Sequence, residues 1–154
     1  MKMLISIRPK WCKLIADGKK TLEVRKTKPR CSLPFKAFIY ESKSTDKSRL
    51  VVYVDSNEPC KYYKGSGKVI GEFICDKIVD IGVPYPAHQQ ETNENVLKQS
   101  CMTYMEMHRY AGNKKVYGYR ISNAVIYDEP KSLSDFQLKK APMSWQYVKE
   151  GRHE

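Results

Sequence analysis

The chain has 154 residues, of which 41% are hydrophobic and 29% are charged, and its formal net charge is +11 at pH 7. This composition predicts one soluble globular domain with a sizeable core, and no apolar run approaches the ~18 residues that a membrane-spanning helix needs. Residues 1–49 hold 14 Lys and Arg against 4 Asp and Glu, and this uneven distribution favours a polyanionic partner over a merely solubilising surface.

A strand and a helix are predicted first. Met3–Ile7 has the apolar composition of a short strand. Pro9 suits the first turn of a helix, and Gly18 suits its C-terminal end. Between them, Trp11, Leu14 and Ile15 recur at helical spacing and make one apolar face, and Trp11 is assigned to the core. The N-terminus lacks the apolar region of a signal peptide, so we predict a cytoplasmic protein with no membrane partner.

The stretch GKKTLEVRK, residues 18–26, follows this helix and predicts a second strand. Its alternation places Glu23 and Arg25 on the same face. Lys20 leads into that face from the end of the helix. Four cations and one carboxylate therefore lie close together in the sequence.

The remaining predicted elements complete a strand-rich chain. They are strands at Phe35–Glu41, Leu50–Val54 and Lys68–Ile81, one helix at Glu91–Tyr110, a strand at Lys115–Tyr127 ended by Asp128–Pro130, a helical turn at Leu133–Phe136, and a last strand within residues 141–148. Gly71 marks a bulge or bend, Tyr40 is assigned to the core, and residues 42–67 form an irregular insertion. We predict an α+β fold: a small mixed or antiparallel β-barrel with two main helices flanking it. The single domain spans residues 1–148, and residues 149–154 form a tail.

The cysteines and histidines predict neither a disulfide framework nor a metal site. The chain has five Cys, with no CxxC pair, and three His. An odd count without a secretion signal predicts reduced thiols, and zinc usually requires clustered ligands at short spacings. We therefore expect no metal and no cofactor.

The residues ISIRPKWCKLIADGKKTLEVRK resemble the start of the ASCH domain, a branch of the PUA-like superfamily. Members show a strand, an Ile-basic-Pro step, a helix, and then G-x-K-x-x-E-x-R, which corresponds here to Gly18, Lys20, Glu23 and Arg25. VIGEFICDKI (69–78) resembles a strand in the middle of the family. Residues 115–136 and 141–148 resemble the closing part of a subgroup associated with phages and prophages of Gram-positive bacteria.

The resemblance implies a PUA-like β-barrel with a cleft around the G-x-K-x-x-E-x-R strand and binding of RNA or related nucleic acids. One related group hydrolyses N4-acetylcytidine, and other members are linked to ribonuclease activity. In those amidohydrolases the strand carries a catalytic Lys followed three positions later by a Thr. Lys20 matches the Lys, but Glu23 stands in place of the Thr, so the hydroxyl nucleophile is missing.

The chemistry of the motif supports a nucleotide ligand. Lys20 is a point cation, and Arg25 offers a fork that can grip a phosphate or stack on a base. Glu23 can accept from a base amino group or a ribose hydroxyl, whereas a pure phosphate site has no use for a carboxylate. The alternative is an internal ion network, which contributes only ~0–1 kcal/mol when it is exposed.

The predicted ligand-binding residues are Ser6, Arg8, Lys19, Lys20, Glu23, Arg25, Lys26 and Trp145. Ser6 reaches the site if the first strand lies beside the strand that carries Glu23, and Arg8 is either a rim residue or simply solvated. Trp145 either stacks on a base or belongs to the core. The predicted function is an RNA-, single-stranded nucleic acid- or nucleotide-binding module, favoured as a monomer.

Two other functions remain open at this stage. The first is a hydrolase, an N4-acylcytidine-type amidohydrolase or a ribonuclease on single-stranded RNA, with Lys20 and Glu23 as its catalytic pair. The second is a phage-encoded protein whose basic face meets an acidic host protein.

Overall fold

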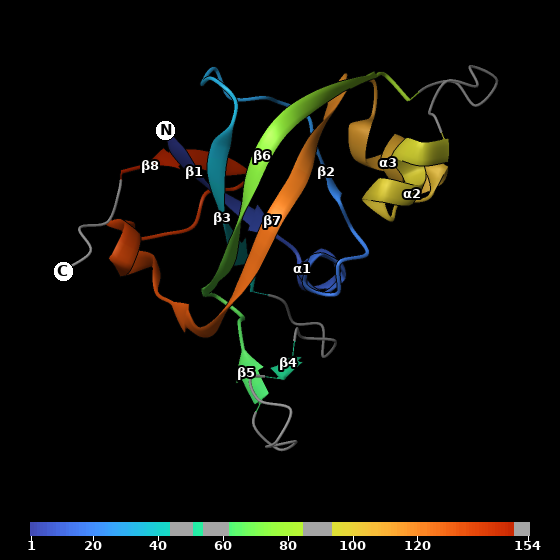
Figure 1. Ribbon diagram of the computed structural model, residues 1–154. Coiled ribbons are helices and arrows are strands. Elements are labelled where there is room, and N and C mark those ends of the chain that lie inside the picture. Colours follow the sequence, from blue (N-terminus) through green and yellow to red (C-terminus); the bar gives the residue numbers. More distant parts are fainter. Residues whose placement is uncertain (44–50, 54–61, 85–93, 150–154) are drawn as a thin grey trace.

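The computed structural model describes residues 1–43, 51–53, 62–84 and 94–149. Within these ranges the chain forms a mixed six-stranded sheet, a separate two-stranded sheet and three α-helices (Figure 1). The elements are β1 (Lys2–Ile7), α1 (Pro9–Ala16), β2 (Leu22–Arg25), β3 (Phe35–Glu41), β4 (Val51–Tyr53), β5 (Tyr62–Lys64), β6 (Val69–Gly82), α2 (Glu94–Ser100), α3 (Tyr104–Ala111), β7 (Val116–Lys131), the 3₁₀ helix η1 (Leu133–Phe136) and β8 (Trp145–Val148). The predicted α+β class is confirmed.

The large sheet has the strand order β2-β7-β6-β3-β1-β8. β1 and β3 run parallel, and every other neighbouring pair is antiparallel. The predicted closed barrel is wrong. Within the described residues, β2 and β8 remain the two edges of the sheet and share no backbone ladder.

Side chains join the two edges where a barrel would have a ladder. Three hydrogen bonds do this: Arg25 Nη1 to Ser144 Oγ at 3.2 Å, Trp145 Nε1 to Thr27 Oγ1 at 3.0 Å, and the backbone N of Arg30 to the Tyr147 hydroxyl at 2.9 Å. We call these three contacts the side-chain seam. Because they connect the two ends of the strand order, the sheet must curl until its edges come within side-chain reach.

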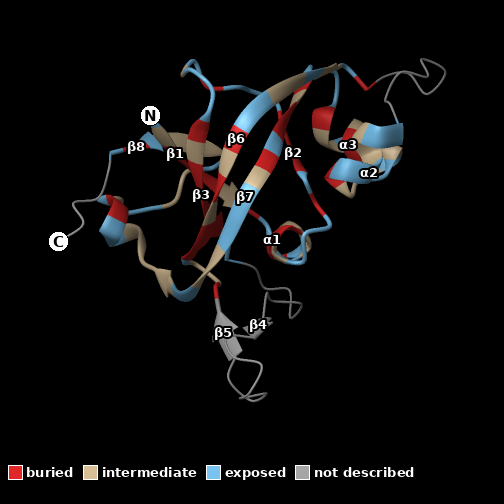
Figure 2. Ribbon diagram, viewed as in Figure 1, coloured by how far each residue is buried: buried red, intermediate tan, exposed pale blue. Residues whose placement is uncertain are grey.

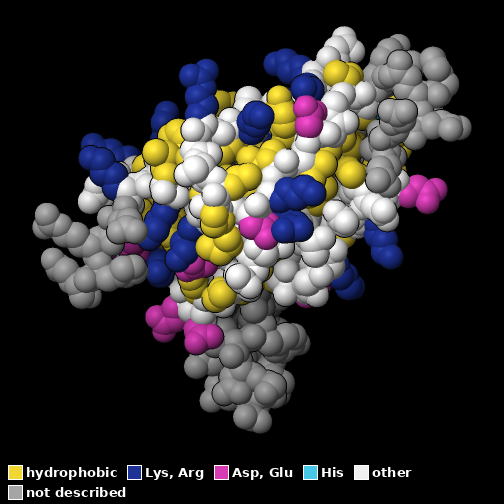
Figure 3. Space-filling model, turned by 45° about the horizontal axis from the view of Figure 1, so that its top comes forward, with side chains coloured by type: hydrophobic (Ala, Val, Ile, Leu, Met, Phe, Trp, Pro, Cys, Tyr) yellow, Lys and Arg dark blue, Asp and Glu magenta, His cyan; other side chains and the backbone are white. Residues whose placement is uncertain are grey.

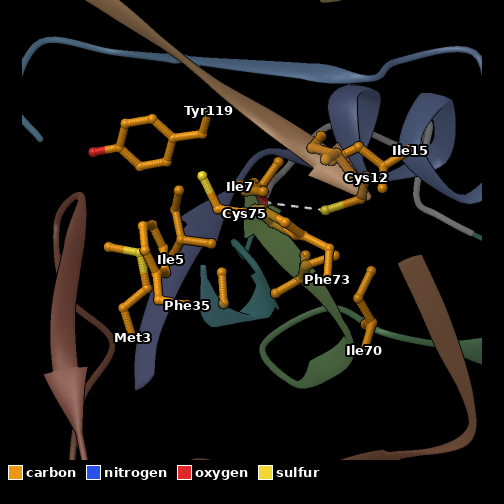
Figure 4. Close-up of a cluster of buried hydrophobic side chains, with 13 residues drawn as sticks. Met3, Ile5, Ile7, Cys12, Ile15, Phe35, Ile70, Phe73, Cys75 and Tyr119 are labelled. Atoms are coloured by element: carbon orange, nitrogen blue, oxygen red, sulfur yellow. Dashed lines mark hydrogen bonds between the residues drawn. The ribbon is translucent and has the colours of Figure 1, made fainter. Parts of the chain in front are cut away.

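The main core packs α1 against the inner face of the curled sheet (Figure 4). Its buried members are Met3, Ile5, Ile7, Cys12, Ile15, Phe35, Ala37, Ile39, Ile70, Phe73, Cys75, Tyr119 and Ile121. The buried positions of α1 are Pro9, Cys12 and Ile15, which recur at helical spacing. Of the predicted apolar face, Ile15 is buried, whereas Trp11 and Leu14 are half-buried. Tyr40 is buried in a second cluster on the other face of β3, which confirms its assignment to a core. Figure 2 shows how burial follows the central strands, with β6 mostly buried in its first half and intermediate or exposed in its second.

The β6–β7 pair is the longest in the sheet and contains several register shifts. One shift falls between Val69 and Gly71, as predicted for a bulge at this glycine. A Cβ atom added to Gly71 would lie 2.2 Å from the backbone oxygen of Val125, so the close approach of the two strands requires glycine. β7 also continues past its predicted end to Lys131. The irregular register accommodates Pro130, which cannot donate to a regular ladder.

The single helix predicted at Glu91–Tyr110 is wrong. Residues 91–93 lie outside the described part of the chain, and the remainder forms α2 and α3 with a break between them. Cys101 has a φ of 57°, which ends α2. Thr103 then opens α3 with a capping box, because its hydroxyl accepts from the backbone N of Glu106 while the Glu106 carboxylate accepts from the backbone N of Thr103.

α2 and α3 lie together beside β2, at the edge of the sheet remote from both termini (Figure 1). A third cluster holds them there, built on Val24 of β2, Met107 and Ala111 of α3, and Val116 of β7. Strands β4 and β5 pair with each other within the predicted insertion, and most of the insertion, like Leu50 and Val54, lies outside the described residues. No helix in the described ranges is long and apolar enough to cross a membrane.

Candidate functional site

Lys20 enters the interior of the protein because the chain turns sharply after α1. Gly18 has a φ of +74°, a conformation that favours glycine. The backbone N of Lys20 then donates to the carbonyl of Leu14 at 3.0 Å. The Lys20 side chain is only 2% exposed. Its ammonium donates to the carbonyl of Ser100 at 2.6 Å and lies 4.6 Å from the ring centroid of Trp11.

This arrangement makes Lys20 a cap for the C-terminal end of α2, where free carbonyls attract cations. The backbone N of Thr21 adds a second contact there, donating to the carbonyl of Gln99 at 2.8 Å. Burial lowers the pKa of Lys20 from its ordinary value, and the negative charge of Glu23 opposes that shift. The ammonium of Lys20 therefore caps α2 through the carbonyl of Ser100 and also belongs to the candidate site.

Glu23 and Arg25 lie on the same face of β2, as the alternation of the strand predicts. Arg25 Nε is 3.3 Å from Glu23 Oε1, and the two side chains are 10% and 7% exposed. Both terminal nitrogens of Arg25 are used elsewhere: Nη2 donates to the carbonyl of Ser6 at 2.7 Å, and Nη1 donates to Ser144 in the side-chain seam. Among the described residues, the buried Oε2 of Glu23 has no hydrogen-bond partner.

These side chains line a cleft of about 740 Å³. Its walls come from the end of β1, α1, β2, α3 with the residues that follow it, and the segment before β8. The lining residues are Ser6, Arg8, Trp11, Lys20, Glu23, Val24, Arg25, Lys26, Thr27, Ser42, Met102, Glu106, Arg109, Tyr110, Lys114, Met143 and Ser144. Lys20, Glu23 and Arg25 form its buried part, whereas Arg8, Lys26, Arg109 and Lys114 are exposed. We call these four exposed cations the rim cations.

Six of the eight predicted binding residues line this cleft. They are Ser6, Arg8, Lys20, Glu23, Arg25 and Lys26. The reason given for Ser6 was wrong, because β1 pairs with β3 and β8 and not with β2. Ser6 reaches the cleft because the sheet curls.

Lys19 and Trp145 do not line the cleft. The side chain of Lys19 is exposed, while its carbonyl accepts from the thiol of Cys101 at 3.3 Å. Trp145 is half-buried, packs against the main core and donates through its indole N–H to Thr27. Its ring also makes an edge-to-face contact with Tyr147 at 5.3 Å. Of the two alternatives for Trp145, the geometry fits a position in the core and not stacking on a base in the cleft.

Several lining residues were missed from the sequence. Trp11 is half-buried and packs against the main core, in agreement with its assignment, and it also lines the cleft. Lys10 and Lys20 each place an ammonium 4.6 Å from its ring centroid. Met143 is fully exposed, at 103%. The residues from α3 onward join the cleft only through tertiary packing, so local spacing contains no signal for them.

Two further charged side chains of the cleft, Glu106 and Lys26, each have a partner. Glu106 belongs to the wall, and its carboxylate is 3.2 Å from the ammonium of Lys10 as well as bonded in the capping box. Lys26 lies 4.8 Å from the ring centroid of Tyr110.

No group of three or more His, Cys, Asp or Glu capable of holding a metal occurs within the described ranges.

The titration of Lys20 gives a testable consequence for stability. Since its pKa in the folded protein is lowered from 10.5, the unfolded chain binds this proton more tightly, and folding becomes more favourable as the pH rises from the lowered pKa to 10.5. The free energy of unfolding of the wild type minus that of Lys20→Met should therefore increase across this interval. Urea denaturation of both proteins from about pH 7 upward measures it.

Taking the difference between the two proteins removes the contributions of groups that both contain. These include Cys12 and Tyr119, whose pKa values are raised by burial. A difference that falls as the pH rises would contradict the lowered pKa of Lys20.

Comparisons with known proteins agree with this architecture. The sequence matches the family model of the ASCH domain over residues 5–127. The crystal structure of the ASCH protein from Zymomonas mobilis has a TM-score of 0.66 at 18% identity, covering 97% of this chain and 88% of that one. Two single-residue variants of that protein each give 0.65 at 19% identity, covering 97% of this chain and 91% or 89% of theirs.

At this identity the solved structures show a shared fold, and no curated protein matches the sequence. The mixed sheet and its helices form the fold that this chain shares with those ASCH structures. Because the family model covers most of the sequence, the chain belongs to the ASCH domain family.

Proposed function

We propose that this ASCH domain binds RNA or a nucleotide in the cleft formed by β2, α1, α3 and the segment before β8. The observation that carries the proposal is the buried Oε2 of Glu23, which has no hydrogen-bond partner among the described residues. An unsatisfied buried acceptor costs about 1–3 kcal/mol, and more when it is charged. A ligand that donates an N–H or O–H to this oxygen removes that cost.

The rim cations supply the second half of such a site. Arg8, Lys26, Arg109 and Lys114 line the cleft with exposed side chains. Contacts between such exposed cations and phosphate groups provide a large share of the affinity of proteins for nucleic acid. In the face seen in Figure 3, Lys and Arg are spread among apolar side chains and do not gather into one patch. The proposal therefore depends on the cleft and not on net charge alone.

A hydrolase is the second candidate, because Lys20 has a lowered pKa and lies in the same cleft as Glu23. In this function Glu23 takes a proton from water, the resulting hydroxide attacks the amide carbonyl of an N4-acylated cytosine, and Lys20 stabilises the developing oxyanion. The C–N bond then breaks as Glu23 returns its proton to the leaving amino nitrogen, and cytosine and a carboxylic acid are released. Ribonuclease action on single-stranded RNA is the other reaction that this pair would serve.

One experiment separates binding from catalysis. Wild type, Lys20→Ala and Glu23→Ala are incubated with N4-acetylcytidine and with single-stranded RNA, and both turnover and binding are measured. We expect intact substrates, binding of RNA by the wild type, and weaker binding by Glu23→Ala. Turnover that disappears in both variants would establish the hydrolase, whereas neither binding nor turnover in the wild type would overturn both functions.

The remaining sequence predictions belong to the same proposal. We propose a monomer that acts in the cytoplasm and has a phage or prophage origin, on the basis of the closing residues 115–136 and 141–148.

A further inference from the structure

On the basis of the proposed function, we infer the orientation and class of the ligand. The cleft binds a nucleotide of single-stranded RNA with its base inward against Glu23 and its phosphates outward at the rim cations. It prefers bases that carry an exocyclic amino group to uracil. The inference rests on how the two parts of the cleft differ in free donors and acceptors.

The cations in the buried part already have partners. Arg25 donates from both terminal nitrogens, to Ser6 O at 2.7 Å and to Ser144 Oγ at 3.2 Å. Lys20 donates to Ser100 O and lies against Trp11. The sequence predicted that the guanidinium of Arg25 could bind a phosphate, but both of its terminal nitrogens already donate to other residues of the protein. The buried Nε of Arg25 makes no hydrogen bond within the described residues, but it lies 3.3 Å from Glu23 Oε1, so a phosphate placed here would also meet the negative charge of Glu23.

The same region offers an acceptor without a partner. Glu23 Oε2 is buried and lines the cleft, and no described residue donates to it. Cytosine and adenine each present an amino group, as does guanine. Uracil presents only its N3–H, which lies between two carbonyl oxygens that repel a carboxylate. The acceptor therefore distinguishes amino-bearing bases from uracil.

The cleft also offers surface for the faces of a ring. Met102 and Tyr110 line it with apolar or aromatic side chains. Base stacking on aromatic side chains tolerates any base, so these walls add affinity without selecting among bases. Selection is left to Glu23.

The outer part has the opposite character. The rim cations are exposed. Glu106, the second carboxylate that lines the cleft in the described part of the chain, is bonded to Thr103 N and lies 3.2 Å from Lys10 Nζ. The charge of Glu106 is thus already balanced, which leaves the rim cations available to phosphates. Phosphates outside and a base inside satisfy both parts of the cleft at once.

The test compares ten-residue oligocytidylate and oligouridylate by fluorescence anisotropy at slightly alkaline pH, over a series of salt concentrations. We expect the wild type to bind oligocytidylate about tenfold or more tightly, since a good base contact discriminates by roughly this much. Glu23→Gln should bring the ratio of the two affinities close to one, because a glutamine amide can also donate to a uracil oxygen. Its salt dependence should match that of the wild type.

Glu106→Gln is the matched control, because it removes a second carboxylate of the same cleft while glutamine preserves the capping box. It should leave the preference for oligocytidylate unchanged. Arg25→Gln should weaken both oligonucleotides without reducing the dependence on salt, since Arg25 positions the site and does not contact phosphate.

Equal binding of the two oligonucleotides by the wild type, or a preference that survives Glu23→Gln, would overturn the base-inward orientation while leaving the proposed function in place. A salt slope about 0.7 shallower in Arg25→Gln than in the wild type would place a phosphate on Arg25 in the buried part and would also overturn it. If the wild type bound neither oligonucleotide, the proposed function itself would fail.

Discussion

Replacing Arg25 with Met is expected to lower the free energy of unfolding by about 3–5 kcal/mol, the usual effect of removing one partner from a buried charged network. The substitution leaves the Ser6 carbonyl and the Ser144 hydroxyl without their donor, and it leaves the Glu23 carboxylate buried without the nearby cation. Urea denaturation at neutral pH measures the change.

Arg120→Met is the matched control for this prediction. Arg120 makes a bidentate ion pair with Asp76 at 2.7 and 2.8 Å, but its side chain is 53% exposed. Exposed pairs contribute about 0–1 kcal/mol, so the control should change stability little. Adding Glu23→Gln to Arg25→Met should recover part of the loss, because the unpaired buried charge is removed. Equal losses of unfolding free energy in the two Arg→Met variants would show that the buried contacts of Arg25 stabilise the fold no more than an exposed ion pair does.

Binding of single-stranded RNA should weaken about 50-fold between 50 and 200 mM salt, if the four rim cations each neutralise one phosphate. The reason is that the logarithm of the binding constant falls with the logarithm of the salt concentration with a slope of about −0.7 for each phosphate contacted on a single strand, or about −3 for four. A variant with Gln at Arg8, Lys26, Arg109 and Lys114 should bind far more weakly and with a slope near zero. Anisotropy titrations at several salt concentrations give both slopes.

The control for this prediction changes the net charge by the same amount at a distance from the cleft. Lys13, Lys68, Lys77 and Lys98 are exposed and do not line it. Their replacement by Gln should leave the slope nearly unchanged. If this control flattened the slope as much as the rim variant does, the affinity would arise from total charge and not from the cleft.

The parts of the site that were predictable from the sequence depend on local periodicity. Strand alternation placed Glu23 and Arg25 together, and the structure has them 3.3 Å apart. The glycine at the end of the first helix indicated where Lys20 leaves it. Neither pattern contains information on what else a side chain contacts, so the use of Arg25 to hold Ser6 and Ser144 could not be predicted.

The charge distribution was informative about composition but not about position. The excess of cations in residues 1–49 suggested that the basic surface would come from the first third of the chain. Two of the four rim cations, Arg109 and Lys114, come instead from α3 and the turn after it. Their place beside β2 depends on the packing of Met107 and Ala111 against Val24, which only the folded chain defines.

The helix predicted across residues 91–110 failed for a related reason. Its apolar residues continue through the break at helical spacing, so periodicity alone extends the helix. The capping box formed by Thr103 and Glu106 starts a new helix within that pattern. The same break places the carbonyl of Ser100 at the end of α2, where it accepts a hydrogen bond from the ammonium of Lys20.

The side-chain seam implies that the two walls of the cleft are joined differently from the rest of the sheet. Separating β1 from β3 would break a continuous ladder of six paired residues. Parting β8 and the residue before it from the end of β2 and the residues after it breaks only isolated hydrogen bonds. These are worth about 0.5–1.5 kcal/mol each between neutral groups and about 1.5–3 kcal/mol for the bond from the charged Arg25 to Ser144. Since Arg25 and Ser144 belong both to the seam and to the cleft, the cleft can widen for a bulkier ligand at this point while every strand keeps its backbone partners.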